Sequence, residues 1–406
     1  MAQPLASLRT NLDFMPSPAP DRPGLLIRDP YRFSDAVLIV PPPLVAALQY
    51  FDGQQTDLDL RKFLVELTGD LDVGGLEENL VTSLSQAGFL EDETFQAMRQ
   101  RRRDEFTAAP VREAAHSGGG YPDQPGPLGD TLRNYLGGAE SPSNVDGLMG
   151  IAAPHVSPFG GWESYRAAYG ALPRDLAGRT FVILGTSHYG EPERFGLTRK
   201  PFATPYGNAQ TDIALVDRLA EEAPEAVKME DYCHAVEHSI EFQVVFLQHL
   251  YGPDIRILPI LCGPYVASLY RGGAPEDNER VKRFLGSLGE MAAREAGRLF
   301  WVLGVDMAHI GRRYGDSFAA TAGEAEMREV SDRDHARIER MNAADATGFW
   351  DAVQERQDDL KWCGSSPIYT FLKVAPQARG KLEHYQQWNI DPQSVVTFAG
   401  ITFHRY

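Results

Sequence analysis

A carboxylate and an imidazole stand three positions apart in the segment GVDMAHIG, residues 304–311. Asp306 and His309 follow the apolar run LFWVL, residues 299–303, which predicts a buried strand. Side chains of these two types, placed together at the end of a strand, can hold a metal ion or exchange a proton with a substrate. This segment is therefore the first place in the chain where we expect chemistry.

Two further histidines occur in the same setting. His155 follows the apolar run 148–154, and His188 follows the apolar run 181–187. In open α/β sheets, ligands bind in the crevice outside the carboxyl ends of the strands. Histidines that are distant in the sequence could therefore converge at this edge, although each alone is also consistent with a structural hydrogen bond.

The cysteines differ in their settings. Cys363 opens the segment CGSSPIYTFL, in which Pro367 predicts the first turn of a helix. A thiol before a helix N-terminus has a lowered pKa, and its thiolate serves as a nucleophile or as a metal ligand. The alternative is a small buried apolar side chain, which we expect for Cys233 and Cys262.

A fourth histidine precedes an apolar helical pattern in AVEHSIEFQVVFLQHL, residues 235–250. Glu237, His238 and Glu241 fall on one face of a helix beginning near residue 238. The order differs from the H-E-x-x-H zinc helix. We expect His238 to lie near the site without binding the metal, and we expect His238 and Glu241 together to orient a metal ligand from a supporting layer.

Composition excludes several classes of function. The 406 residues carry a net charge of -17, which argues against binding to nucleic acid or to an anionic membrane. The sequence has no apolar run long enough to span a membrane and no apolar N-terminal core typical of a signal peptide. The three cysteines lie far apart, so we expect no disulfide framework and a cytoplasmic location.

The chain is predicted to divide into two domains. Residues 1–22 read as a flexible arm, 23–105 as a small α+β domain resembling a winged helix, and 106–128 as a Gly- and Pro-rich linker. In residues 129–406, apolar runs alternate with helical patterns. This alternation predicts an α/β fold with a mixed, largely parallel sheet that helices cover on both faces.

Histidines, a cysteine and a nearby carboxylate suit a borderline metal such as iron, zinc or copper. His309 is then available as a base. A GxSxG nucleophile elbow does not occur, which argues against an α/β-hydrolase serine.

The ordered motifs of residues 147–406 resemble those of the Memo family, protein B of the AmmeMemoRadiSam gene set. The motifs are APH…GW, LGTSH, EHSIEFQ, DMAHIG and CG…PI. The family fold is similar to that of the class III extradiol dioxygenases, which cleave catechol-type rings with non-haem Fe(II). The resemblance implies an extradiol dioxygenase-like fold here.

The resemblance also implies roles for individual residues. His155, His188 and Cys363 would be the metal ligands, with Fe(II) as the expected metal and copper or zinc as alternatives. Asp306 and His309 would lie beside the metal as catalytic residues, with His309 as the acid/base. Cys363 stands where the dioxygenases carry a ligating glutamate, and family members include non-enzymatic partners in signalling.

The N-terminal pattern resembles, over about 70 residues, the peptide-chaperone domain of pyrroloquinoline quinone biosynthesis. It suggests a peptide or radical-SAM partner for this domain. Three functions follow as hypotheses. The first is a non-haem iron, dioxygenase-type oxidoreductase acting on a small organic or peptide-linked substrate. The second is a non-catalytic metal- or peptide-binding partner of a maturation system, and the third is a zinc hydrolase.

Overall fold

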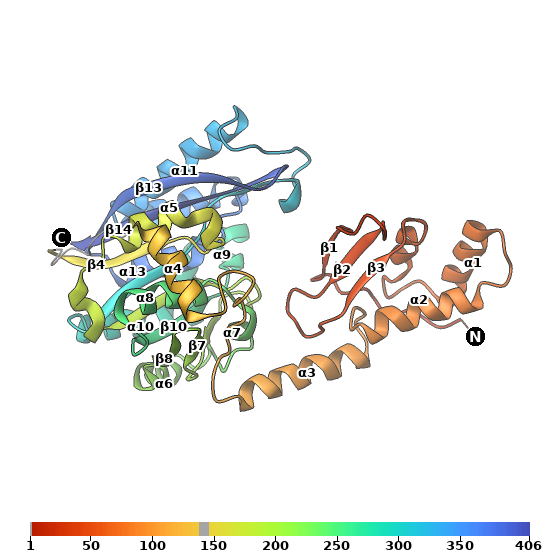
Figure 1. Ribbon diagram of the computed structural model, residues 1–406, viewed down its shortest axis with the longest axis horizontal. Coiled ribbons are helices and arrows are strands. Elements are labelled where there is room, and N and C mark those ends of the chain that lie inside the picture. The colour runs from red at the N-terminus through yellow and green to blue at the C-terminus, as the bar shows by residue number, and fades with distance from the viewer. Residues whose placement is uncertain (1, 138–145) are drawn as a thin grey trace. The chain divides into compact units, whose positions relative to one another are not determined.

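The protein consists of two units, each with its own core. The computed structural model describes residues 2–137 and 146–406 and divides the chain into Met1–Ala109 and Pro110–Tyr406 (Figure 1). Part of the predicted larger domain, residues 138–145, lies outside the described residues. Among the residues that are described, no helix combines the length and the apolar character needed to span a bilayer.

The N-terminal unit is a small α+β structure. Its sheet has the antiparallel order β1-β2-β3, formed by Asp13–Pro16, Leu25–Arg28 and Val37–Val40. The α-helices of the unit are α1 (Asp57–Thr68), α2 (Gly74–Gln86) and α3 (Glu93–Ala108), preceded by the 3-10 helix η1 (Pro42–Tyr50). Helix α1 begins with a capping box between Thr56 and Asp59, and Gly69 ends it in a left-handed conformation.

The arm predicted for residues 1–22 is not loose. Leu5 and Leu12 are buried in the core of the N-terminal unit, and β1 lies within this segment. Arg9 is buried and forms an ion pair with Asp29 at 3.0 Å. The prediction was wrong because the Pro- and Ser-rich composition concealed a few apolar residues that are enough to anchor the segment.

The larger unit is built on a mixed sheet with a parallel centre. Strands β4, β11, β5 and β10 are neighbours in this order and run parallel. Antiparallel strands extend the sheet at both sides, with β14 beside β4 and β6 beside β10. The strands named here are β4 (Leu148–Ala153), β5 (Thr180–Thr186), β6 (Phe195–Leu197), β10 (Arg256–Cys262), β11 (Leu299–Gly304) and β14 (Ser394–Arg405). The predicted fold class is confirmed.

Short strands and one long hairpin complete the sheet. Strands β12 and β13 both pair with β14, β9 pairs with β6, and β8 pairs with β10 and β7. Their bounds are β7 (Phe202–Thr204), β8 (Gly207–Thr211), β9 (Val227–Met229), β12 (His309–Gly311) and β13 (Ala378–Asp391).

Helices cover both faces of the sheet because successive residues of each central strand point in opposite directions. In β11, Phe300 and Val302 pack into one core with α4, α5 and α8, whereas Trp301 and Leu303 pack into the other core with α6 and α10–α13. The principal helices are α4 (Pro125–Leu136), α5 (Pro158–Tyr169), α6 (Ile213–Glu222), α8 (Glu241–Tyr251), α10 (Glu279–Arg294), α11 (Glu326–Asn342), α12 (Ala346–Gln354) and α13 (Ser365–Val374).

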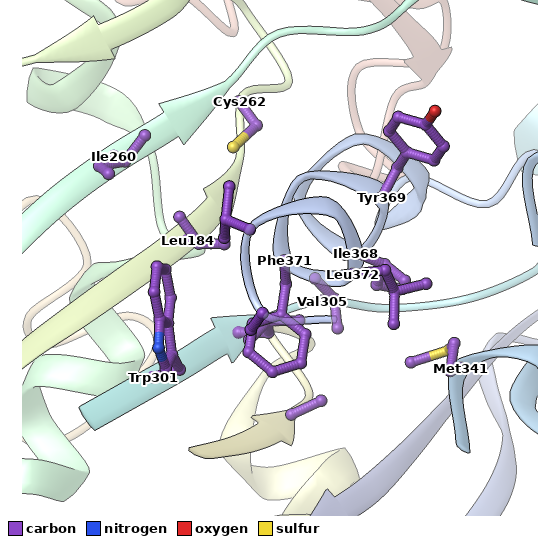
Figure 2. Close-up of a cluster of buried hydrophobic side chains, with 14 of the residues drawn as sticks. Leu184, Ile260, Cys262, Trp301, Val305, Met341, Ile368, Tyr369, Phe371 and Leu372 are labelled. Carbon is purple, nitrogen blue, oxygen red and sulfur yellow. The ribbon is translucent and has the colours of Figure 1, made fainter. Parts of the chain in front are cut away.

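Helix α13 is fixed against the centre of the sheet. Figure 2 shows Ile368, Phe371 and Leu372 of α13 in the same buried cluster as Trp301 of β11. The rings of Trp301 and Phe371 meet edge-on, with centroids 5.7 Å apart. This packing holds the start of α13, and hence residues just before it, near the strand ends.

The predicted linker, residues 106–128, belongs largely to folded structure. Helix α3 continues to Ala108 and α4 begins at Pro125. Between them, Arg112 is fully buried and its backbone N–H donates to the carbonyl of Pro201. The Gly- and Pro-rich composition predicted a linker, but a buried arginine and several hydrogen bonds fix the segment to the larger unit.

The start of α8 approaches the sheet closely where two strands carry glycine. A Cβ atom on Gly304 would lie 2.1 Å from the carbonyl oxygen of Ser239, and one on Gly185 would lie 2.5 Å from the Ser239 hydroxyl oxygen. Glycine at these two positions therefore lets the segment before α8 lie against the strand ends.

The Gly304→Ala substitution tests this contact. We expect a loss of about 1–3 kcal/mol in the free energy of unfolding, because the added methyl group overlaps backbone and must displace the segment around Ser239. Urea denaturation measures the loss. The matched control is Gly286→Ala in α10, which has open space around it and should gain about 0.5–1 kcal/mol. Equal stability of both variants would contradict the close approach.

Candidate functional site

Three neighbouring strands deliver polar side chains to one place. His155 follows β4, Asp306 follows β11 and His188 follows β5, and these strands lie side by side in that order. The Asp306 carboxylate accepts a hydrogen bond from the backbone N–H of His155 at 2.9 Å. The rings of His155 and His188 have centroids 4.9 Å apart. The structure therefore brings these predicted residues together.

A third imidazole joins this pair. His238, just before α8, has its ring centroid 5.1 Å from that of His155 and 5.0 Å from that of His188. One nitrogen of each ring lies within 4.8 Å of the others, a spacing that suits a shared metal ion. His238 was expected to lie near the site in a supporting layer, but the geometry makes it a potential donor itself.

Hydrogen bonds set the tautomer of each ring. Nδ1 of His155 lies 2.9 Å from the carbonyl oxygen of Gly304. Nδ1 of His188 and Nδ1 of His238 lie 3.0 and 3.1 Å from the same Glu237 carboxylate oxygen. These oxygens only accept, so each Nδ1 carries a proton. Burial would lower the pKa of His188, but the Glu237 carboxylate raises it well above its ordinary value, so a metal at Nε2 of His188 would take the place of a second proton. Metal-binding histidines commonly have this arrangement.

Glu237 is the carboxylate that orients His188 and His238, a role that the sequence did not predict. Its side chain is buried, and it also accepts from the backbone N–H groups of His188 and His238, both at 2.9 Å. Burial would raise the pKa of Glu237, but the two imidazoles hold it well below its ordinary value. The available signal was its position next to His238; the predicted helix drew attention to Glu241 instead.

Cys363 lies against the imidazoles. Its Sγ is 3.3 Å from Nε2 of His155 and donates to the carbonyl oxygen of Asp306 at 3.7 Å. The prediction of a lowered thiol pKa at a helix N-terminus differs from the structure, because burial raises the pKa of Cys363. Cys233 and Cys262 are buried, as expected, and contribute to the two cores.

Both carboxylate oxygens of Asp306 lie close to His155. One oxygen binds the His155 backbone, and the other lies 3.5 Å from Nε2 of the same ring. Burial raises the pKa of Asp306, and the neighbouring His309 ring would oppose this rise only when it is protonated. The carboxylate thus lies on the same side of His155 as the Cys363 thiol.

His309 is held separately by two carbonyl groups. Its Nδ1 lies 2.9 Å from the oxygen of Met307 and 3.1 Å from that of Lys361, so Nδ1 carries the proton. The ring meets Tyr314 edge-on, with centroids 4.8 Å apart. Burial lowers the pKa of His309 to about 4, despite the neighbouring Asp306 carboxylate. His309 is therefore a neutral imidazole with Nε2 available as an acceptor.

Glu241 pairs with Arg112 and does not form the predicted pair with His238. Helix α8 begins at Glu241, so Glu237 and His238 lie before it and do not share its face. The buried Glu241 carboxylate pairs with Arg112 and accepts from the Tyr121 hydroxyl and from the backbone N–H of His116 at 2.9 Å. It fixes residues 112–121 onto α8.

This anchored segment contributes to the wall of the site. His116 lies with its ring centroid 5.5 Å from that of His238, and its Nε2 is 2.9 Å from the Val236 carbonyl oxygen. The sequence reasoning passed over His116 because it occurs in a stretch that reads as a linker. The pairing of Arg112 with Glu241 brings His116 to this position, and the sequence gives no local sign of that pairing.

The cluster is buried on one side and accessible on the other. The side chain of His155 is 2% exposed, whereas those of His188 and His238 are each 27% exposed. A small molecule can therefore reach the exposed sides of His188 and His238 from solvent.

The residues fit a metal ion. The Cys363 thiol meets Nε2 of His155 beside the ring of His188, and the oxygens that hold Nδ1 of both rings are already in place. An ion bonded at about 2.0–2.3 Å to nitrogen and sulfur holds those atoms roughly 3–4 Å apart, which matches the 3.3 Å between Cys363 and His155.

Comparison with known proteins gives a consistent family. The family described as Memo-like protein matches residues 112–402. A MEMO1 family protein of Aquifex aeolicus is 24% identical over 387 residues, covering 93% of this chain and 96% of that protein. The MEMO1 family protein PF1638 of Pyrococcus furiosus is 28% identical over 308 residues, covering 73% of this chain and 99% of that protein.

The two relatives differ in their extent. Coverage of 93% requires the Aquifex alignment to enter the N-terminal unit, whereas the Pyrococcus alignment covers a share close to that of the larger unit alone. A crystal structure of the uncharacterized protein JW3007 from Escherichia coli K12 is similar over 63% of this chain and 99% of that chain, at a TM-score of 0.38 and 14% identity.

The Arg112→Leu substitution tests the anchoring of residues 112–121. We expect a loss of about 3–5 kcal/mol in the free energy of unfolding, because Glu241 is left as a buried carboxylate without its cation. Denaturant unfolding measures the loss, and hydrogen exchange should show residues 112–121 opening first. Arg133→Leu, which breaks an exposed pair with Asp130, should change stability by no more than about 0.5 kcal/mol. Equal losses in both variants would contradict the anchoring role.

Proposed function

Because the chain belongs to the Memo-like protein family, we propose that its larger unit is a metal-dependent oxidoreductase of dioxygenase type. The single observation that supports this most strongly is the convergence of His155, His188 and Cys363. The hydrogen-bond partners of Nδ1 in both histidines are already in place. Family membership alone does not specify a reaction. The proposal therefore rests on the chemistry of the clustered side chains.

The proposed ligands are His155, His188 and Cys363. The Cys363 thiol lies 3.3 Å from Nε2 of His155, and the rings of His155 and His188 have centroids 4.9 Å apart. His238 lies beside the open side of this set and is the proposed contact for a bound substrate. Its Nδ1 is fixed by Glu237, so Nε2 can accept a hydrogen bond from a hydroxyl or an amine.

Iron is the metal proposed for this donor set. Imidazole accommodates iron, copper and zinc, and thiolate is a soft ligand that all three accept. When bound, a redox-active iron would supply the electron transfer needed to oxidise an organic substrate with O2. Zinc in the same site would supply Lewis acidity instead, which is the basis of the hydrolase alternative.

The proton in this proposal moves through His309. Its Nδ1 proton is engaged by two carbonyl groups, and its Nε2 lone pair can accept a proton from an acidic hydroxyl of the substrate. A general base of this kind typically contributes a factor of about 10²–10⁴ to the rate. Asp306 holds the His155 backbone and would stabilise the positive charge on the His309 ring after proton transfer.

We propose a second function for the N-terminal unit. It has its own hydrophobic core, and in the Aquifex relative the aligned region extends into it. A partner-binding role for this unit, with a peptide or a radical-SAM enzyme as the partner, is compatible with either a catalytic or a purely metal-holding larger unit.

Metal analysis of the protein reconstituted anaerobically with Fe(II) tests the ligand set. We expect about one iron per chain in the wild type and in His309→Asn, and a large loss of iron in His188→Ala and Cys363→Ser, because these remove donor atoms. Oxygen uptake with a catechol probe should fall by about 10²-fold or more in His309→Asn. His404→Ala and Cys262→Ala, which lie outside the cluster, are the matched controls.

Other outcomes separate the alternatives. Stoichiometric iron without oxygen uptake would favour the metal-holding partner, and retention of zinc in preference to iron would favour the hydrolase. A wild-type chain that retains no metal under these conditions would contradict the oxidoreductase, the metal-holding partner and the hydrolase, and would leave only the peptide-binding role.

A further inference from the structure

The segment that carries Cys363 has an unusual backbone. It joins α12 to α13, and Arg356, Gln357, Asp358 and Lys361 all have φ values between 52° and 54°. They are four of the eight non-glycine residues with left-handed φ in the described part of the chain. Such conformations persist only where the surroundings hold them, and they are concentrated at functional sites.

The end of this segment contacts the site through its backbone. The carbonyl groups of Leu360 and Lys361 accept from the backbone N–H and from Nδ1 of His309, at 2.8 and 3.1 Å. Cys363 contacts His155, and the N–H of Gly364 donates to the carbonyl of Asp306 at 3.1 Å. Trp362 lies between Lys361 and Cys363 in the sequence, but its side chain contacts helix α11 instead of the imidazoles.

Trp362 is held by a buried carboxylate on α11. Its indole Nε1 donates to Asp334 at 2.7 Å, and the other oxygen of Asp334 accepts from the Tyr385 hydroxyl, also at 2.7 Å. Asp334 is fully buried. Burying a carboxylate costs free energy unless its oxygens accept hydrogen bonds. Asp334 therefore stays buried because Trp362 and Tyr385 each donate to one of its oxygens.

Arg337, which is also on α11, holds the turn that precedes Trp362. Arg337 donates to Asp358 at 2.7 Å, and the other oxygen of Asp358 accepts from the backbone N–H of Trp362 at 2.9 Å. Asp334 and Arg337 lie three positions apart and so project from one face of α11. One helix therefore fixes the left-handed turn and the tryptophan next to Cys363.

We propose that Asp334 is a positioning residue, whose hydrogen bond to Trp362 places the Cys363 thiol against His155 and the two carbonyl groups against His309. This inference deepens the proposed function and depends on it for the metal, but the thiol position can be measured without metal. Asp334 reaches the thiol through Trp362, and in the described part of the chain its hydrogen bonds from Trp362 and Tyr385 involve neither the imidazoles nor the thiol.

Paired variants separate positioning from general stability. Trp362→Phe removes the indole N–H that Asp334 accepts, whereas Tyr385→Phe removes the other hydrogen bond to the same carboxylate. The first readout is the rate at which iodoacetamide alkylates Cys363 in the full-length, metal-free chain, followed by peptide mass spectrometry. The second is the thiolate-to-cobalt absorption band and the affinity for Co(II).

We expect Trp362→Phe to raise the alkylation rate several-fold, to weaken the thiolate band and to lower Co(II) affinity by about 10–100-fold. Tyr385→Phe should leave all three unchanged. Asp334→Asn keeps an acceptor oxygen for Trp362 and should behave as wild type, whereas Asp334→Ala should match Trp362→Phe.

The proposal is overturned if Trp362→Phe and Tyr385→Phe have equal effects, or if neither alters alkylation of Cys363. A wild-type chain that takes up no Co(II) contradicts the metal site of the proposed function, and the alkylation rates then still decide whether Asp334 positions the thiol.

Discussion

The arrangement of this protein depends on the parallel register of three neighbouring strands. Gly304 of β11 is paired with Ala153 of β4 and with Gly185 of β5, so the three strands end at nearly the same level. Within three residues of that level the chain places His155, His188 and Asp306. Burial on both faces of the sheet makes this register costly to shift, because a one-residue slip would turn every core side chain to the opposite face.

The strand ends alone do not orient the imidazoles. Glu237 fixes His188 and His238 through one buried carboxylate, and the Gly304 carbonyl fixes His155. Glu237 reaches this position because the glycines of β5 and β11 allow the segment before α8 to lie against them. Close packing and polar orientation are thus two consequences of the same contact between α8 and the sheet.

The sequence predicted the sheet well because its signal is local. Continuous apolar runs mark β4, β5 and β11, and each is followed directly by a polar side chain. It placed His238 less well, because the helical spacing suggested a helix from residue 238 whereas α8 begins at Glu241. A three-residue error at a helix start paired His238 with Glu241, whereas its carboxylate partner in the structure is Glu237.

Long-range pairs account for what the sequence could not show. Arg112 and Glu241 are 129 residues apart, and Asp334 and Trp362 are 28 residues apart. Neither pair leaves a periodic pattern, and the first begins in a stretch whose Gly and Pro content predicts a linker. The segments 1–22 and 106–128 were misjudged for the same reason, since composition describes a segment without its partners.

The most direct test of the central claim is anomalous diffraction from crystals of the chain grown with Fe(II), recorded on both sides of the iron absorption edge. We predict one iron peak within about 2.0–2.4 Å of Nε2 of His155, Nε2 of His188 and Sγ of Cys363. Side chains that point away from a common centre, or an iron peak bound elsewhere on the chain, would contradict it.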